Sequence, residues 1–479
     1  MGLSSKTDPH PLRAAMPHCA TSRCCHASRS DVFAPAHLGE LTGVVPPEMV
    51  DAALEAGGGR ERRLRRLPSR VIVYLLLAGA LFVGHGWSYV FSRLTAKDDG
   101  RVRTPARSAL SGAMRPVGPR PLRELFHLLA GPGTAGTGRR TRFAGRLVVA
   151  LDGTRAPIAD TERNRMVFPK PRGGPNGQAG YPMVRLVALI ATGTRSMIDA
   201  VFGTDRVGEL SCADTLLGAL RSPMLLPADR NFAAHRIFDR VAAAGADFLI
   251  RARTGRRAMK LAPVKRLPDG SWLARVRGRP VRVVDATIRV TTRTSTSTSE
   301  YRLITTLLDP ATAPAEHLVG LHHDRWEIET AYCEPKSTIL DATAGRARHP
   351  SGVEQELWAL VATYQVGRIA MCDAILHRPD IAPDRLSFTT ALRTARDQID
   401  LAAAAIARTT VDLIGQIGTA LLADLLPERR IRTRPRVIKR AICQAPGQEP
   451  RRGQAHPPRD TPHPNPPTST QPLTERHWG

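Results

Sequence analysis

One stretch, from His322 to Lys336, carries side chains whose types and spacing suit chemistry on a negatively charged ligand. It contains no glycine, has one late proline and is rich in good helix formers, which predicts a helix. At 3.6 residues per turn, one arc of about 80° holds His322, Arg325, Glu329, Tyr332 and Lys336. An imidazole, two cations, a carboxylate and a phenol on one face favour a carboxylate that works beside an anion. The alternative is a salt-bridged surface helix.

Two further carboxylates each follow a short apolar run that reads as a β-strand. The run LVVALDGT carries Asp152 at its end, and MLLPA leads to Asp229. Ligands of open α/β sheets collect just beyond strand ends, although a lone strand-end aspartate more often caps a turn. Together with Glu329, the two aspartates form a set without a thiol or histidine partner, which suits a hard cation such as Mg²⁺. Two such ions about 4 Å apart can activate a hydroxyl and stabilise the leaving oxygen at a phosphodiester.

The segments that must position these side chains alternate between strands and helices, which predicts an α/β fold. Further strands are expected in MVRLVALIAT, MIDAVFG, DFLIRAR and YRLITTLL. The segment 253–300 predicts a β-rich insertion. In chain order we expect a disordered extension (1–37), a helical domain (38–130), an α/β domain (143–425), a basic segment (426–443) and a disordered proline-rich tail (444–479).

The composition favours a polyanionic partner. The chain has 479 residues, a net charge of +26 and a pI near 11.0, which suits nucleic acid, although a genome rich in G and C also raises the arginine content. Its seven cysteines are scattered without paired CxxC spacing, so we expect no disulfide framework and a reducing cytosol. The one long apolar run, Val71 to Gly84, is too short to cross a bilayer of about 30 Å. A buried helix is therefore expected there, and no membrane association.

Several specific stretches then resemble the DDE transposases of bacterial insertion sequences, of the insertion-sequence-4 type. The resemblance runs from about residue 41 to residue 441. It rests on LTGVVPPEMV, VALDGT with Asp160 and Asn164 following, ADRNF, YRLITTLLD and RWEIETAYCEPK. The signature of that family is Tyr-x2-Arg-x3-Glu-x6-Lys, and Arg325, Glu329 and Lys336 match it at the right spacing.

The resemblance implies an RNase-H-like mixed sheet with flanking helices and a β-rich insertion, preceded by an all-α domain that binds transposon ends. It implies a metal-binding catalytic triad of Asp152, Asp229 and Glu329, holding two Mg²⁺ or Mn²⁺ ions. The residues implied to contact DNA are Arg325, Lys336, Arg230 and His322. The expected protein is a cytoplasmic, nucleoid-associated transposase that acts on double-stranded DNA, as a homodimer in the DNA complex, by hydrolysis and strand transfer.

Four positions depart from the family pattern. His322 stands where the signature has tyrosine, and Asn231 replaces a usual glycine. Pro335 removes a helix hydrogen bond near Lys336, and Pro227 falls in the strand that leads to Asp229. These departures keep open a catalytically impaired DNA-binding remnant, or an inhibitor of related transposases. A third, weaker alternative is an RNase-H-like nuclease of another family.

Overall fold

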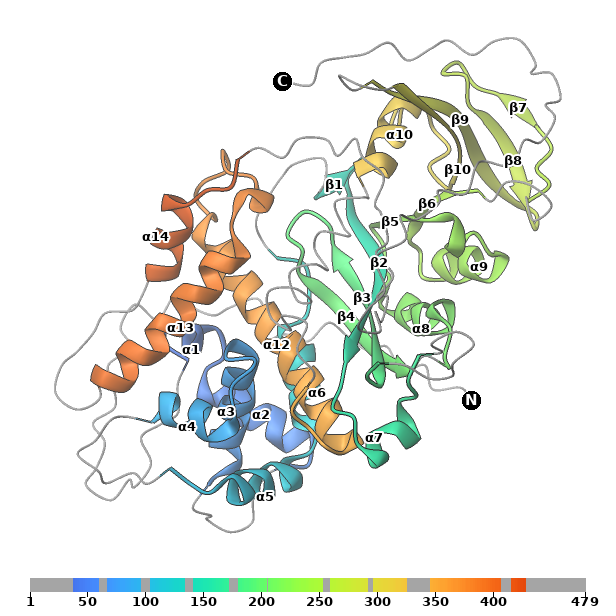
Figure 1. Ribbon diagram of the computed structural model, residues 1–479. Helices are drawn as coiled ribbons and strands as arrows, with labels where there is room; N and C mark the ends of the chain where they lie inside the picture. Colours follow the sequence, from blue (N-terminus) through green and yellow to red (C-terminus); the bar gives the residue numbers. More distant parts are fainter. Residues whose placement is uncertain are drawn as a thin grey trace, which may run out of the picture.

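A long mixed β-sheet runs through the centre of the molecule, and helices from both ends of the chain pack together on one side of it (Figure 1). This computed structural model describes residues 38–59, 67–95, 104–133, 141–171, 180–204, 206–252, 259–291, 296–324, 345–405 and 415–427. The expected extension, nearly all of the basic segment and the expected tail lie outside these ranges. Within them, no helix has the length and apolarity that crossing a membrane requires.

The sheet has the strand order β4-β3-β2-β5-β6, continued by β10-β9-β8-β7, with β1 beside β2. The pairs β2–β3 and β3–β4 are antiparallel, whereas β2–β5 and β5–β6 are parallel. Three antiparallel strands followed by two parallel ones confirm the expected RNase-H-like α/β class. The strands are β1 Arg142–Phe143, β2 Arg146–Pro157, β3 Met183–Ala191, β4 Met197–Thr204, β5 Met224–Ala228 and β6 Asp247–Arg251.

The β-rich insertion extends this sheet and is not a separate body. Its last strand, β10, pairs antiparallel with β6 through Leu303 to Thr305, so the insertion continues the sheet past β6. Its described strands are β7 Lys265–Arg266, β8 Trp272–Val276, β9 Arg279–Thr291 and β10 Thr296–Thr305, which reach slightly beyond the expected end at residue 300.

Alternation along the strands places apolar side chains on both faces of the sheet. On one face, Val149 and Leu189 pack against α8 and α9. On the other, Ala188 and Ile190 pack against the helices from the two ends of the chain. The helices between strands are α7 Glu162–Val167, α8 Glu209–Leu216 and α9 His235–Ala243, and α10 Ala315–Asp324 follows the last strand, β10.

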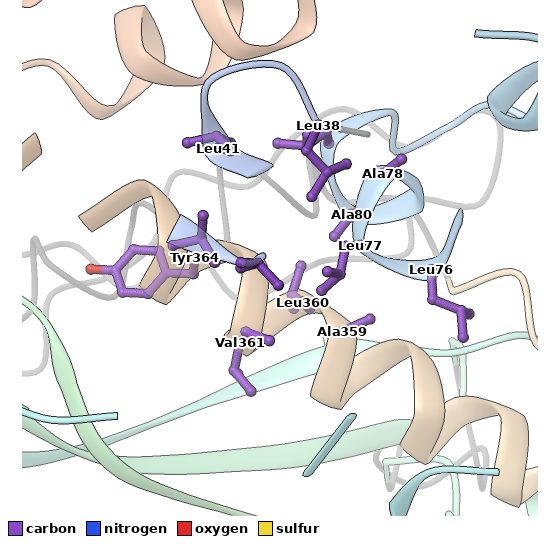
Figure 2. Close-up of a cluster of buried hydrophobic side chains, with 14 of the residues drawn as sticks. Leu38, Leu41, Leu76, Leu77, Ala78, Ala80, Ala359, Leu360, Val361 and Tyr364 are labelled. Carbon is purple, nitrogen blue, oxygen red and sulfur yellow. The ribbon is translucent and has the colours of Figure 1, made fainter. Parts of the chain in front are cut away.

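The helices of the expected N-terminal domain share one core with the C-terminal helices. Figure 2 shows Leu77 of α3 close to Leu360 of α12. Helix α3 is buried along almost its whole length, as its apolar run predicts. The helices are α1 Leu41–Val44, α2 Pro47–Ala56, α3 Ser69–Leu81, α4 Trp87–Leu94, α5 Arg107–Val117 and α6 Arg120–Leu129, then α12 Pro350–Ala374, α13 Phe388–Ala405 and α14 Gln416–Ala423.

Buried polar side chains of α12 fix how the N-terminal helices sit on it. Gln355 Nε2 donates to Met114 O at 3.1 Å, near the end of α5. Gln365 Nε2 donates to Leu129 O at 3.0 Å, at the end of α6. Helix ends leave carbonyl groups without helical partners, and Gln365 supplies a donor to one of them at Leu129 O. Met114 O also accepts from the Gly118 amide at 3.3 Å, so Gln355 adds a second donor there.

The shared core predicts that both sets of helices unfold together. Leu77→Ala should lower the free energy of unfolding by about 2–5 kcal/mol, because Leu77 is fully buried between α3 and α12. Hydrogen exchange should then speed up in α12 and α13 as well as in α3. The half-exposed Leu128 of α6 gives a control, and Leu128→Ala should change little. Faster exchange confined to the N-terminal helices would contradict a common core.

Candidate active site beside strands β2 and β5

Asp229 lies directly after the buried strand β5. It caps a short 3-10 turn, Arg230–Phe232, and its Oδ1 accepts a hydrogen bond from the Arg230 amide at 2.6 Å. This bond orients the carboxylate at the end of the strand. Asp229 is partly exposed and Arg230 is exposed, so both are accessible from solvent.

Counted along β2 and β5 from their last paired residues, Asp152 and Asp229 occupy equivalent positions. In the parallel pairing of β2 with β5, Val148 stands opposite Leu225, and four further residues on each strand lead to the two aspartates. Neighbouring strands lie about 4.8 Å apart, so this register brings two distant parts of the sequence together. The sequence suggested that the first strand ends at Asp152. That expectation is wrong: β2 continues to Pro157, with Asp152 paired opposite Ala188 of β3.

Pro227 is accommodated within β5. The paired residues of β2 and β5 end at Leu225, two positions before the proline, and Pro227 keeps its place opposite Leu249 of β6. Proline has no N–H to donate, and the ladder to β2 ends before that amide would be needed. Asn231 lies in the 3-10 turn and is not among the residues with positive φ, so it needs no left-handed conformation.

His322 is a structural contact of β5 and not an exposed DNA ligand. Its side chain is 2% exposed, and its Nε2 lies 3.2 Å from Ala228 O, one residue before Asp229. Its ring packs edge-on to Tyr301, with centroids 6.1 Å apart. This burial corrects the expectation that the His322 side chain contacts DNA: the side chain connects α10 to the end of β5. The helix itself begins at Ala315, seven residues earlier than expected.

The remaining signature residues, namely Arg325, Glu329, Pro335 and Lys336, lie outside the described residues, as does the side chain of Asp152. In the described part of the chain, no cluster of three or more His, Cys, Asp or Glu side chains could hold a metal ion. The third carboxylate expected at the site lies outside that part. The donor chemistry does fit: two aspartates at one level of the sheet supply the oxygen ligands that hard divalent cations prefer.

Comparisons with known proteins agree with this geometry. A family model described as "Transposase DDE domain" matches residues 143–366, and one described as "Insertion element 4 transposase N-terminal" matches residues 35–127. Transposase InsG for insertion sequence element IS4, from Escherichia coli strain K12, is 25% identical over 411 residues, covering 84% of this chain and 92% of InsG.

The chain belongs to the insertion-sequence-4 type of DDE transposases.

A second relative and one solved structure are also similar. Putative transposase InsZ, from the same strain, is 25% identical over 190 residues, covering 39% of this chain and 62% of InsZ. A piggyBac transposase synaptic complex with hairpin DNA aligns with a TM-score of 0.43 and 10% identity, over 81% of this chain and 85% of that one. That likeness adds nothing to the topology described above. Membership of the family makes this transposase a phosphoryl-transfer enzyme that acts on DNA and depends on divalent metal ions.

The transposase also contains buried hydrogen bonds that the sequence did not reveal. Asn164 is fully buried, and its Nδ2 donates to Ala159 O at 2.9 Å and to Ala347 O at 3.0 Å. It therefore ties the loop after β2 to the segment that leads into α12. Glu356 of α12 accepts from the main-chain amides of that segment, at Arg346 and Ala347. No spacing in the sequence links these residues, because the contacts depend on how distant elements meet.

Glu356 should make the stability of this transposase depend on pH. Burial raises the pKa of its carboxyl to about 7, against the attraction of Arg346 and the two amides. A raised pKa means that the folded state binds the proton more tightly than the unfolded state. The stabilisation is therefore complete below the ordinary value near 4.5 and is lost as the pH rises through about 7.

Glu356→Gln should remove this dependence, because glutamine does not ionise. Between pH 5 and pH 8 the free energy of unfolding of the wild type should fall by up to about 2 kcal/mol relative to that of the variant, as measured by denaturant unfolding. Glu354→Gln, two residues earlier and exposed, serves as the control and should keep the pH profile of the wild type. Parallel profiles for the wild type and Glu356→Gln would show that the carboxyl does not titrate in this range.

Proposed function

We propose that this transposase cuts the DNA at the ends of its own mobile element and joins the freed 3′-hydroxyl groups to target DNA. The observation that carries the proposal is the parallel register of β2 and β5, which sets Asp152 and Asp229 at one level of the sheet. The matches to a transposase N-terminal model and a DDE domain model support the same reaction. The intact course of β5 past Pro227 removes one argument for an impaired remnant.

We propose that Asp152, Asp229 and Glu329 hold two Mg²⁺ or Mn²⁺ ions. When bound, such ions help to ionise the attacking hydroxyl and to neutralise charge on the leaving oxygen. The chain itself supplies the carboxylate oxygens, and the main-chain amide of Arg230 orients the carboxylate of Asp229. Arg325 and Lys336 are proposed to hold the DNA near the cleaved phosphate, and the exposed Arg230 to contact it beside β5.

Loss of one carboxylate should abolish cleavage and preserve DNA binding. Asp152→Asn, Asp229→Asn and Glu329→Gln are each expected to reduce Mg²⁺-dependent cleavage of labelled end DNA by at least about 100-fold, as loss of a key electrostatic group does in other enzymes. Chelation of the metal should stop the wild type in the same way. Asp239→Asn is the control, since Asp239 lies on α9 and pairs with Arg277 at 3.0 Å. Cleavage that persists in Glu329→Gln would refute the mechanism, and no cleavage by the unmodified chain would favour the impaired remnant.

We further propose that a basic cluster of Arg115, Arg163 and Arg348 contacts the DNA backbone. All three are exposed, and they come from α5, from α7 and from the segment before α12. Partial burial and the cations of Arg115 and Arg163 lower the pKa of His349, the residue that follows Arg348 in the sequence. Clustered cations at a junction between elements fit a phosphate backbone.

Two copies are proposed to act together on the DNA, because a mobile element has two ends and each chain carries one set of the three carboxylates. The DNA substrate would place the protein at the bacterial nucleoid, in the cytoplasm.

Removal of each cation of the cluster should weaken DNA binding in a salt-dependent way. Each of Arg115→Ala, Arg163→Ala and Arg348→Ala should make the slope of log K against log salt shallower by about 0.9, the value for one lost phosphate contact. Arg378→Ala is the matched control, since Arg378 lies beyond the opposite end of α12 and pairs with Asp380 at 2.9 Å. Slopes equal to that of the control would remove this cluster from the DNA interface.

A further inference from the structure

Residues 345–348 form a short junction between the catalytic strand and α12. The Gly345 amide donates to the carbonyl of Pro157, the last residue of β2, at 3.2 Å. The next two amides, of Arg346 and Ala347, donate to Glu356 Oε2 at 2.9 and 3.3 Å. The main chain of the junction is therefore held between the end of β2 and the first turns of α12.

The loop that follows β2 holds the same junction from another side. Thr161 Oγ1 donates to the carbonyl of Arg348 at 2.9 Å, and Asn164 Nδ2 donates to that of Ala347 at 3.0 Å. Thr161 also caps α7 through the amide of Asn164. Thr161 and Asn164 therefore connect the junction to the start of α7.

The side chain of Arg346 extends from the junction to the end of α3, among the N-terminal helices. Its guanidinium donates to Gly79 O at 2.8 Å and to Phe82 O at 2.6 Å, at the end of α3, and to His85 O at 2.7 Å. It also lies over the Trp87 ring, 4.5 Å from the centroid. A planar cation with five donors can satisfy three carbonyls and stack on a ring at once, which lysine cannot do.

The glycine at position 79 of α3 makes this arrangement sterically possible. A Cβ atom at Gly79 would overlap the Trp87 ring and crowd the Arg346 guanidinium. Glycine therefore permits the close approach of both side chains to the end of the helix. The carbonyls at a helix C-terminus carry partial negative charge, so a cation is favoured there.

We propose that Arg346 is a positioning residue that couples the N-terminal helices to the catalytic strand β2. The inference rests on the proposed function and on the expectation, from the family resemblance, that the N-terminal helices bind the transposon end. Asp152 lies on β2 five residues before Pro157, and Glu329 precedes Gly345 by sixteen residues in the sequence. One side chain thus connects the helices that receive DNA with the strand that carries a catalytic carboxylate.

Arg346→Ala should separate binding from catalysis. We expect end-DNA affinity and KM to stay near wild type while kcat for cleavage falls about 10–100-fold, because misplacement by about 1 Å can cost that much in rate. Arg346→Lys keeps the charge and should give an intermediate kcat. Arg378→Ala again serves as the control. All rates are measured well below the melting temperature of each variant, so that loss of folded protein does not enter.

Hydrogen exchange gives a second readout, which does not depend on activity. End DNA should slow exchange in both α3 and β2 of the wild type, whereas in Arg346→Ala it should slow exchange in α3 alone. The coupling role would be overturned if end DNA slowed hydrogen exchange in β2 as much in Arg346→Ala as in the wild type. It would also be overturned if the kcat of Arg346→Ala equalled that of Arg378→Ala. Absence of cleavage by the wild type would instead count against the proposed function, so the two failures are distinguishable.

Discussion

The proposed active site depends on the parallel register between β2 and β5. Two aspartates from separate parts of the sequence reach one level of the sheet only because Leu147 pairs with Met224 and Val148 with Leu225. A slip of one residue would turn every side chain of one strand to the opposite face, so apolar packing on both faces holds the register. Helix α10 adds a further restraint where His322 meets the end of β5.

The long helix α12 organises the rest of the molecule around this pair of strands. One part of its surface packs on β3 and β4, and others receive α3 and α6. Its buried amides satisfy carbonyls at the ends of N-terminal helices, and such buried polar contacts favour one arrangement over others because an unpaired buried group is costly. Hydrophobic contact brings these helices together, and the hydrogen bonds determine their orientation.

Much of this architecture was predictable from the sequence, because it is local. The apolar runs predicted β3, β4, β5 and the buried α3. The features that could not be predicted depend on contacts between elements that are distant in the sequence. Strand β2 extends beyond its apolar residues because β3 continues to pair with it up to Pro157. His322 appeared to lie on an exposed functional face, but its burial depends on β5 and Tyr301, which the sequence around it does not reveal. The junction around Arg346 joins four elements and leaves no periodic pattern.

The shared core of the first and last helices has a consequence for synthesis of the protein on the ribosome. About 300 residues separate the end of α6 from the end of α14, and at 5–20 residues per second their translation takes roughly 15–60 s. During that interval the apolar faces of the first helices lack the partner that covers them in the finished molecule. A prematurely terminated chain would keep those faces uncovered and be a substrate for chaperones and proteases. Full-length translation thereby becomes a condition for any stable DNA-binding product of the gene.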